Sequence, residues 1–391
     1  MKLALPFVLI STAACFRAAN IDANQAGLTI HEWGTFTSVA GEDGSAVEWN
    51  ALGCKSDLPG FVNDYGYRNF KWSLQGTVRM ETPVMYFYSP REMEAHVKVS
   101  FPQGLITEWY PQAEYEVYQK SRKLPTNLNG IDTSLRSLTG AIEWSNIKVE
   151  PDTSPALPIE NGPSRYYAAR ATDAAPITVG EQHEKFLFYR GVARFPVPLS
   201  VRLERDGRVA VQNTGSEPVP VAILFENRDG HVGFLNVGAV TDAVMLDRPS
   251  LDGSMAVLRS DLEAALTAQG LYPAEARAML STWQDSWFEE GSRLIYILSS
   301  HVVYGVLPLH VDPTPAETAR VFVGRIELVT PEVKSAVEQA IVKRDRPALE
   351  RYGRFLDAIL TRISAASDVK AMQIQQFREG VLPYQGISQC R

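Results

Sequence analysis

Short segments that alternate apolar and polar side chains, with turn residues between them, most constrain what this chain can fold into. In residues 95–101 (AHVKVSF) every second side chain is apolar, and residues 78–88 (VRMETPVMYFY) are rich in β-branched and aromatic residues. Residues 105–110 and 141–149 have the same character. Such segments predict half-buried strands, so we expect an antiparallel, aromatic-rich β domain over residues 28–150.

A tight hairpin is the clearest local signal in the middle of the chain. Residues 199–203 (LSVRL) and 209–211 (VAV) flank Asp206-Gly207, a dipeptide that suits the positive φ angles of a hairpin turn. Further short apolar segments follow, separated by turn residues, which is typical of a β-sandwich. We therefore predict an immunoglobulin-like β-sandwich in residues 165–245, preceded by a Pro-rich linker in residues 151–164.

The periodicity changes to that of helices in the last part of the chain. Residues 261–270 and 274–290 predict helices, and residues 293–299 and 320–329 return to a strand pattern. Apolar residues then repeat at helical spacing between positions 349 and 363, which predicts a long final helix. We expect an α/β region over residues 246–391 that ends in helices, and thus a β-rich, multi-domain α+β protein.

The first residues predict export from the cytosol. Lys2 precedes an apolar stretch, residues 3–14, which has the length of a secretory signal core and falls short of the roughly 20 residues that span a bilayer. We predict a signal peptide in residues 1–19 and a mature chain without a transmembrane span that is secreted, periplasmic or held in the cell envelope. The residues before Cys15 (TAA) resemble a bacterial lipoprotein box, although an aliphatic residue is usual where Thr12 stands. Lipidation of Cys15 and simple cleavage therefore both stay open.

Composition limits the class of partner. The chain is 45% hydrophobic and 10% aromatic, as globular proteins are, and it carries a net charge of −7 without basic runs. An acidic chain of this kind lacks the basic clusters that bind the phosphates of nucleic acids, so we predict no nucleic-acid partner. If Cys15 is removed or acylated, Cys54 and Cys390 remain, and they are either bonded to each other or separate thiols. No prediction of oligomeric state follows from the sequence.

Familiar catalytic motifs do not occur in the sequence. We find no His-Glu-x-x-His, no Cys-x-x-Cys, no Gly-x-Ser-x-Gly and no glycine-rich phosphate loop. Any two of the six histidines are at least nine residues apart, and the Asp-Gly turns lack the ligand spacing of an EF-hand. We therefore predict neither a cofactor nor a metal site, and we disfavour zinc peptidases and elbow-type serine hydrolases.

Ionisable residues inside predicted strands are the first candidates for a site. Glu32 shares a strand face with apolar residues, where a carboxylate must have a partner or a raised pKa, and His31 and Trp33 lie on the opposite face. Arg79 and Glu81 share one face of another predicted strand. A general acid or metal ligand at Glu32 or His31, and a ligand-holding Arg79–Glu81 pair, are the functional interpretations. Structural ion pairs, for example with an arginine, are the alternative.

Aromatic residues are the second candidate. Five of the seven tryptophans lie in the first 150 residues, and Glu108-Trp109-Tyr110 sets a carboxylate beside two rings, as saccharide sites often do. Filling of the core is the alternative use of such rings.

Two functions therefore stay open, and the sequence does not decide whether the chain is an enzyme. The first is an exported binding or structural protein that recognises a polymer such as a glycan or cell-wall polysaccharide through His31, Trp33, Arg79, Trp109 and Tyr110. The second is a glycosidase-like hydrolase with a site in the N-terminal β domain, whose two acids must lie about 5–10 Å apart. Its candidate acids are Glu32, Glu81 and Glu108.

Overall fold

The computed structural model describes residues 27–52, 58–64, 74–124, 135–162 and 164–364, together with positions 370, 372, 374 and 375. The predicted signal peptide and all three cysteines lie outside these residues. Across the described ranges, no helix is both long enough and apolar enough to cross a bilayer.

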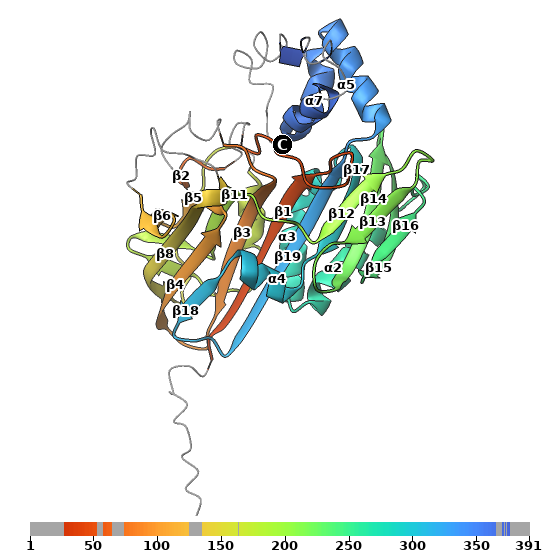
Figure 1. Cartoon of the computed structure of the whole chain (residues 1–391). Coiled ribbons are helices and arrows are strands. Elements are labelled where there is room, and N and C mark those ends of the chain that lie inside the picture. Colours follow the sequence, from red (N-terminus) through yellow and green to blue (C-terminus); the bar gives the residue numbers. More distant parts are fainter. Residues whose placement is uncertain are drawn as a thin grey trace, which may run out of the picture.

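One large mixed sheet forms the centre of the molecule (Figure 1). Its main path contains β1 (Thr29–Val39), β3 (Val78–Tyr88), β5 (Gly104–Tyr110), β8 (Leu138–Val149), β9 (Ile177–Val179), β10 (Gln182–Glu184), β11 (Leu187–Ala193), β14 (Val219–Arg228), β15 (His231–Val240), β17 (Gly291–Ile297) and β19 (Glu317–Leu328). Along this path the strand order is β10-β9-β8-β5-β11-β3-β1-β19-β17-β14-β15. Off the path, the same sheet includes β2 (Asn63–Asp64), β4 (Met93–Pro102), β6 (Glu114–Gln119), β7 (Arg122–Lys123) and β18 (Leu309–Asp312). A second sheet has the order β12 (Leu199–Leu203), β13 (Val209–Asn213), β16 (Ala243–Leu246).

Helices lie behind, in front of and above the large sheet in the view of Figure 1. The α-helices are α2 (Met255–Ala268), α3 (Pro273–Trp287), α4 (Ser300–Val306), α5 (Pro331–Lys343), α6 (Arg346–Glu350) and α7 (Leu356–Ser364). Short 3₁₀ turns occur at η1 (Leu135–Ser137), η2 (Arg165–Arg170) and η3 (Gly353–Phe355). Helices α2 and α3 lie behind the sheet, α4 lies in front, and α5 and α7 lie above its upper end.

Strand β1 occupies the middle of the sheet and joins distant parts of the chain. It pairs in parallel with β19, where Thr29 lies opposite Glu317, and antiparallel with β3, where Thr29 lies opposite Tyr88. Strands from each of the three predicted regions therefore lie side by side in one sheet. The coarse expectation of a β-rich α+β protein is confirmed, with a sheet that runs across the predicted domain boundaries.

Successive side chains of β1 pack alternately into two separate hydrophobic cores. Leu28, Ile30 and Phe36 face the front core, which lies between the large sheet and a layer made of β4, β18, α4, β12 and β13. Trp33 faces the rear core, where the sheet packs on α2 and α3. A third cluster lies under α5 and α7. Burial on both faces explains why nearly every residue of β1 is buried.

Many individual elements agree with the sequence pattern, and two differ from it. Strand β3 has the predicted bounds, and β12 and β13 form the predicted hairpin, with Gly207 at a φ of 87°. Helix α2 begins at Met255, six residues before the predicted start at position 261. The predicted final helix is instead divided into α6, η3 and α7.

A close approach between neighbouring strands fixes one glycine. Gly324 of β19 lies opposite Tyr296 of β17, and a Cβ atom at position 324 would lie 2.0 Å from the tyrosine ring. The Tyr296 ring can occupy this space only because position 324 has no side chain.

Candidate functional site

Glu32 lies inside the front core, where it has an arginine partner. Its Oε2 atom accepts a hydrogen bond of 2.6 Å from Nε of Arg320, and its Oε1 atom accepts one from the Tyr189 hydroxyl. Arg320 also donates to the carbonyl of Leu307 at 2.7 Å. The side chains of Glu32 and Arg320 are both fully buried. Both carboxylate oxygens of Glu32 thus have partners within the protein. This matches the structural ion pair with an arginine that the sequence left open as the alternative to a catalytic role.

His31 lies on the opposite face of β1 and pairs with a residue that the sequence did not single out. Its Nδ1 atom is 2.8 Å from Oε2 of Glu275, which is fully buried in the first turn of α3. The same carboxylate accepts hydrogen bonds from the backbone N–H of Tyr272 at 2.7 Å and from the Tyr88 hydroxyl at 2.8 Å. The ring of His31 packs 4.4 Å from that of Tyr272, centroid to centroid.

The start of α3 carried a signal that could have identified Glu275. Pro273 is the first residue of the helix, and Glu275 is at the third helical position, where a glutamate reaches back to the N–H that precedes the helix. Nothing local shows that His31 and Tyr88, 244 and 187 residues away, share this carboxylate.

Arg79, Glu81 and Glu108 gather at the other end of the same rear face. Nε of Arg79 lies 3.7 Å from Oε1 of Glu81, and Nε of Arg190 lies 3.4 Å from Oε2 of Glu108. Strand β11 separates β3 from β5, so the Cα atoms of the two glutamates are roughly 10 Å apart at the usual strand spacing. Beside Glu81, buried Thr82 has a φ of 45°, a strained conformation for a β-branched residue.

The three suspected carboxylates therefore do not share one site. Glu32 faces the front core, whereas Glu81 and Glu108 face the rear. His31 lies four residues from the strand position opposite Glu81, which is about 13 Å along β1.

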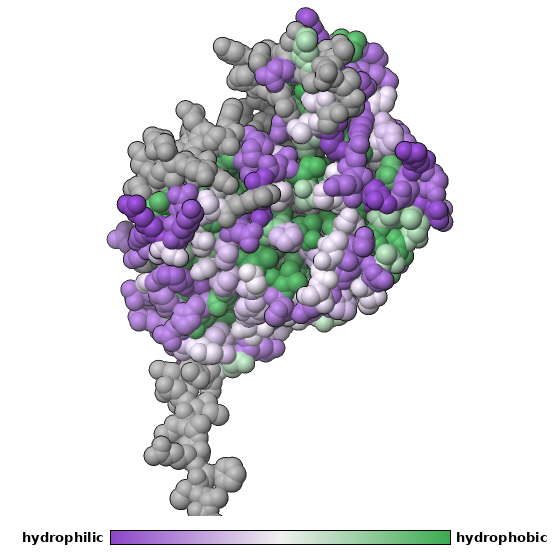
Figure 2. Space-filling view, viewed as in Figure 1, coloured by the Kyte–Doolittle hydropathy of each residue, from purple (hydrophilic) through white to green (hydrophobic). Residues whose placement is uncertain are grey.

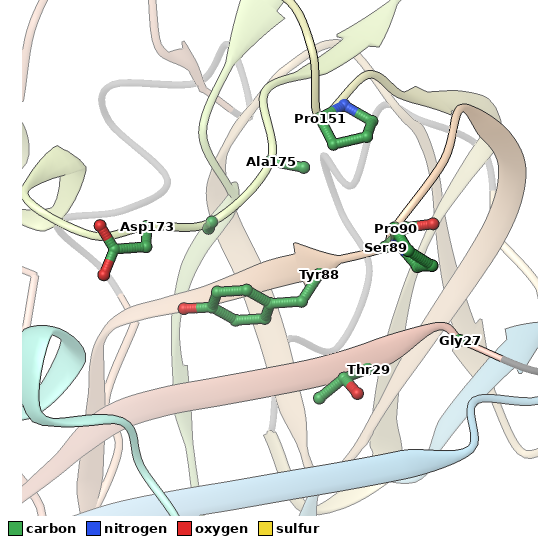
Figure 3. A pocket seen from close by; sticks show the side chains of 9 residues that line it. Gly27, Thr29, Tyr88, Ser89, Pro90, Pro151, Asp173 and Ala175 are labelled. Atoms are coloured by element: carbon green, nitrogen blue, oxygen red, sulfur yellow. The ribbon is translucent and has the colours of Figure 1, made fainter.

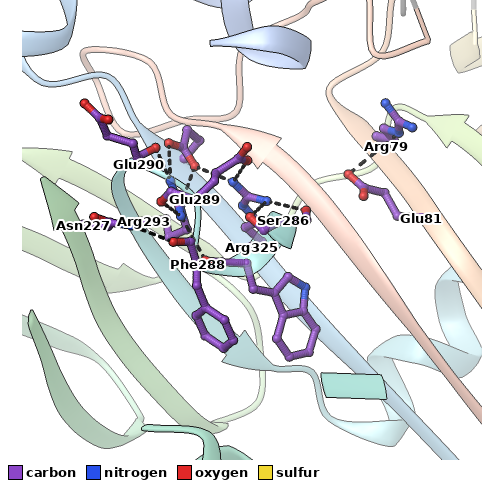
Figure 4. A network of polar contacts seen from close by, with 11 residues as sticks. Arg79, Glu81, Asn227, Ser286, Phe288, Glu289, Glu290, Arg293 and Arg325 are labelled. Atoms are coloured by element: carbon purple, nitrogen blue, oxygen red, sulfur yellow. Dashed lines mark hydrogen bonds and ion pairs between the residues drawn. The ribbon is translucent and has the colours of Figure 1, made fainter. Parts of the chain in front are cut away.

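A further polar network joins the end of α3 to the sheet (Figure 4). Arg293 donates to the carbonyl of Trp287 at 2.9 Å, and Arg325 donates to that of Ser286 at 2.5 Å. Arg325 also donates to Glu289 at 2.6 Å. These arginines satisfy carbonyls that a helix end leaves without partners, so the network fixes α3 on the sheet.

The aromatic candidates from the sequence are buried. The exposed fraction is 0% for Trp33, 7% for Trp109 and 3% for Tyr110. Trp109 stacks on Tyr115 at a centroid distance of 5.2 Å, and Tyr110 packs edge-on against Phe61. These rings fill the interior, so they offer little open surface on which a sugar could stack.

A groove on the front of the molecule has a volume of about 550 Å³. It lies between the start of β12, the segment that leads into it from β11, and a loop after β1. Figure 2 shows apolar surface in the middle of this side of the molecule, with hydrophilic surface on both flanks. The polar residues that line the groove are Ser45, Thr77, Gln103, Arg194, Ser200 and Thr214. Its apolar lining residues are Ala46, Phe195, Pro196, Val197 and Leu199.

A smaller hollow of about 260 Å³ lies beside Tyr88, at the lower end of the rear face. Burial and the neighbouring Glu275 carboxylate raise the pKa of Tyr88 well above its usual value. In the described part of the chain, no group of three or more His, Cys, Asp or Glu side chains is arranged to hold a metal ion.

Comparisons with known proteins do not assign the chain to a family. No family and no curated protein matches it. Among solved structures it is similar to a yeast delta-COP-I mu-homology domain complexed with a Dsl1 WxWxV peptide, with 10% identity and a TM-score of 0.30. It is also similar to an Fcho1 mu homology domain of Danio rerio with a bound Eps15 peptide, with 8% identity and a TM-score of 0.29. Each similarity covers 77% of this chain and 96% of the other, and is too slight to carry an argument about fold or function.

Proposed function

We propose that this chain is an exported binding protein of the cell envelope or the extracellular space, and that it holds a segment of a glycan in the front groove. The observation that carries the proposal is the lining of that groove, which combines hydroxyl, amide and guanidinium groups with apolar side chains. The proposal keeps the ligand class expected from the sequence. It moves the contact surface from the N-terminal aromatic residues to the groove.

The chemistry of a sugar fits this lining. A sugar ring presents hydroxyl groups at its edge and C–H groups on its faces, so it needs hydrogen-bonding side chains around an apolar surface. Gln103, Ser200 and Thr214 supply uncharged donors and acceptors, and Phe195 and Val197 supply apolar contacts. A volume of about 550 Å³ lies within the usual range for ligand sites and has room for a short oligosaccharide segment.

The sheet arrangement supports the same placement. We propose that β12, β13 and β16, together with the strands behind them, form the immunoglobulin-like sandwich expected from the sequence. Val201 and Val211 of this small sheet pack in the front core with Leu224 of β14. The groove then lies beside strand β12 of the sandwich, on a rigid scaffold.

Retention on insoluble polysaccharides and cell-wall material tests the proposal. Thr214 is exposed at the groove, so Thr214→Trp should fill part of the groove and reduce retention at least tenfold while the fold is kept. Thr267→Trp is the matched control, because Thr267 is exposed on α2, behind the sheet. Absence of retention for the unchanged protein, or equal retention of both variants, would refute glycan binding in the groove.

Export is tested separately by sequencing the N-terminus of the protein recovered from producing cells. The proposal expects a chain that begins after the apolar stretch, within residues 15–20, in the envelope or medium. An unprocessed chain in the cytosol would refute it.

A carboxylate-dependent hydrolase is the second candidate, and one observation favours it. The strained backbone at Thr82 adjoins Glu81, and the hydroxyl of Thr35, opposite Glu81 on β1, has no hydrogen-bond partner among the described residues. Strained residues and unsatisfied polar groups concentrate at active sites. Glycan hydrolysis that is lost in both Glu81→Gln and Glu108→Gln would support this candidate, and hydrolysis that persists in both would exclude it.

A further inference from the structure

In the small hollow beside Tyr88, all polar side-chain atoms of the lining are oxygens (Figure 3). It lies where the start of β1, the end of β3 and the segment around residue 173 meet. Thr29, Tyr88, Ser89 and Asp173 contribute side-chain oxygen atoms, and the other lining residues are glycine, proline and alanine. No lining side chain carries a nitrogen donor, and the carboxylate of Asp173, which only accepts, favours a ligand that donates hydrogen bonds.

Hydrogen bonds outside the hollow strengthen this preference. The Tyr88 hydroxyl donates its only hydrogen to Glu275, and the Ser89 hydroxyl donates to the carbonyl of Arg91. The Tyr88 oxygen is therefore left as an acceptor, whereas the Ser89 oxygen already accepts from the backbone N–H of Arg91 at 3.3 Å. Burial raises the pKa of Tyr88 above its ordinary value, so the phenol stays protonated at neutral pH and well above it, and can donate to Glu275 throughout.

The charges around the hollow are mainly negative. The carboxylate of Asp173 is exposed and has no hydrogen bond or ion pair among the described residues. Glu275 places a second carboxylate directly behind the Tyr88 hydroxyl, with His31 on its far side. Lys185 is the cation that interacts electrostatically with Asp173, and its ammonium group donates to the carbonyl of Thr172 at 2.5 Å.

We propose that this hollow is a binding site for a small protonated primary amine. Its ammonium group lies between the Asp173 carboxylate and the Tyr88 side chain, where the ring face and the hydroxyl oxygen both attract a cation. The apolar chain of the amine packs against Pro90 and Pro151. A volume of about 260 Å³ has room for an amine of a few carbon atoms.

Isothermal titration of the full mature chain with n-butylammonium at neutral pH tests the site. Asp173→Asn should weaken binding at least tenfold, because it removes the exposed charge and keeps the shape. Glu181→Gln is the control, since Glu181 is an exposed acid in the nearby β9–β10 turn and does not line the hollow. Lys185→Gln should strengthen binding, because it removes the competing cation.

n-Butanol, which has the same chain without the charge, should not bind measurably. Equal binding of n-butanol, unchanged binding in Asp173→Asn, or weaker binding in Lys185→Gln would each overturn the proposal. Binding of an end-blocked Gly-Lys-Gly peptide distinguishes a lysine side chain from a free amine: the proposed small-molecule site requires that the peptide bind more weakly than n-butylammonium. Because the hollow and the front groove share no lining residue, failure of one proposal leaves the other standing.

Discussion

Substitution of Glu32 by glutamine is the sharpest test of how the centre of the sheet is held together. The change preserves size and removes one charge from a fully buried pair. Nε of Arg320, 2.6 Å away, then keeps its positive charge in the front core without a carboxylate. Such an uncompensated buried charge destabilises a protein by about 3–5 kcal/mol.

The expected size of the effect follows from the contacts of the pair. Arg320 retains its bond to the carbonyl of Leu307, so part of its hydrogen bonding survives. The Tyr189 hydroxyl loses a charged acceptor and gains a neutral one, and such a bond is worth about 1.5–3 kcal/mol with a charged partner. We therefore expect Glu32→Gln to lower the free energy of unfolding by about 3–5 kcal/mol in total.

Urea unfolding monitored by tryptophan fluorescence measures this quantity. The double variant Glu32→Leu/Arg320→Met should lose less stability than Glu32→Gln alone, because both charges are removed together. Glu350→Gln is the control: its exposed pair with Arg346 spans one turn of α6 and contributes no more than about 0.5 kcal/mol. A loss below about 1 kcal/mol for Glu32→Gln, or a double variant less stable than the single one, would refute the argument.

Two further predictions concern packing and pH. Gly324→Ala should destabilise the protein by about 3 kcal/mol or more, because the Cβ atom of the alanine would collide with the Tyr296 ring. Gly305→Ala in α4 is the control: its Cβ atom meets no other atom, so stability should stay equal or rise slightly. Thermal melts of both variants measure the difference. Hydrogen bonds from Lys123 and the Tyr118 hydroxyl hold the pKa of Glu116 below its usual value in the folded protein. The ionised Glu116 carboxylate therefore stabilises the fold above the unfolded-state pKa, and this stabilisation is lost as the pH falls through the lower, folded-state pKa. Glu116→Gln should therefore lose more stability relative to the unchanged protein at pH 7 than at pH 3, and a difference that is the same at both pH values would contradict the assignment.

The sequence by itself determined local structure wherever one face of an element is buried. In β4 the alternation of Ala95, Val97, Val99 and Phe101 matches the buried positions one for one. The turn at Gly207 followed from its dipeptide, because few residues adopt positive φ angles. The faces of β1 were also predictable, since a period of two places Glu32 and His31 on opposite sides.

The tertiary structure alone decided which distant residues meet. Arg320 lies 288 residues from Glu32, and Glu275 lies 244 residues from His31, so no spacing along the chain reveals these pairs. Sheet topology creates both, because β1 pairs with β19 in front of α3. Whether an aromatic ring or a carboxylate is exposed depends on what covers it, and the layer in front of the sheet buries Trp109 and Glu32 alike. Local patterns record the side of a strand on which a residue lies, but the partner on that side is set by long-range packing.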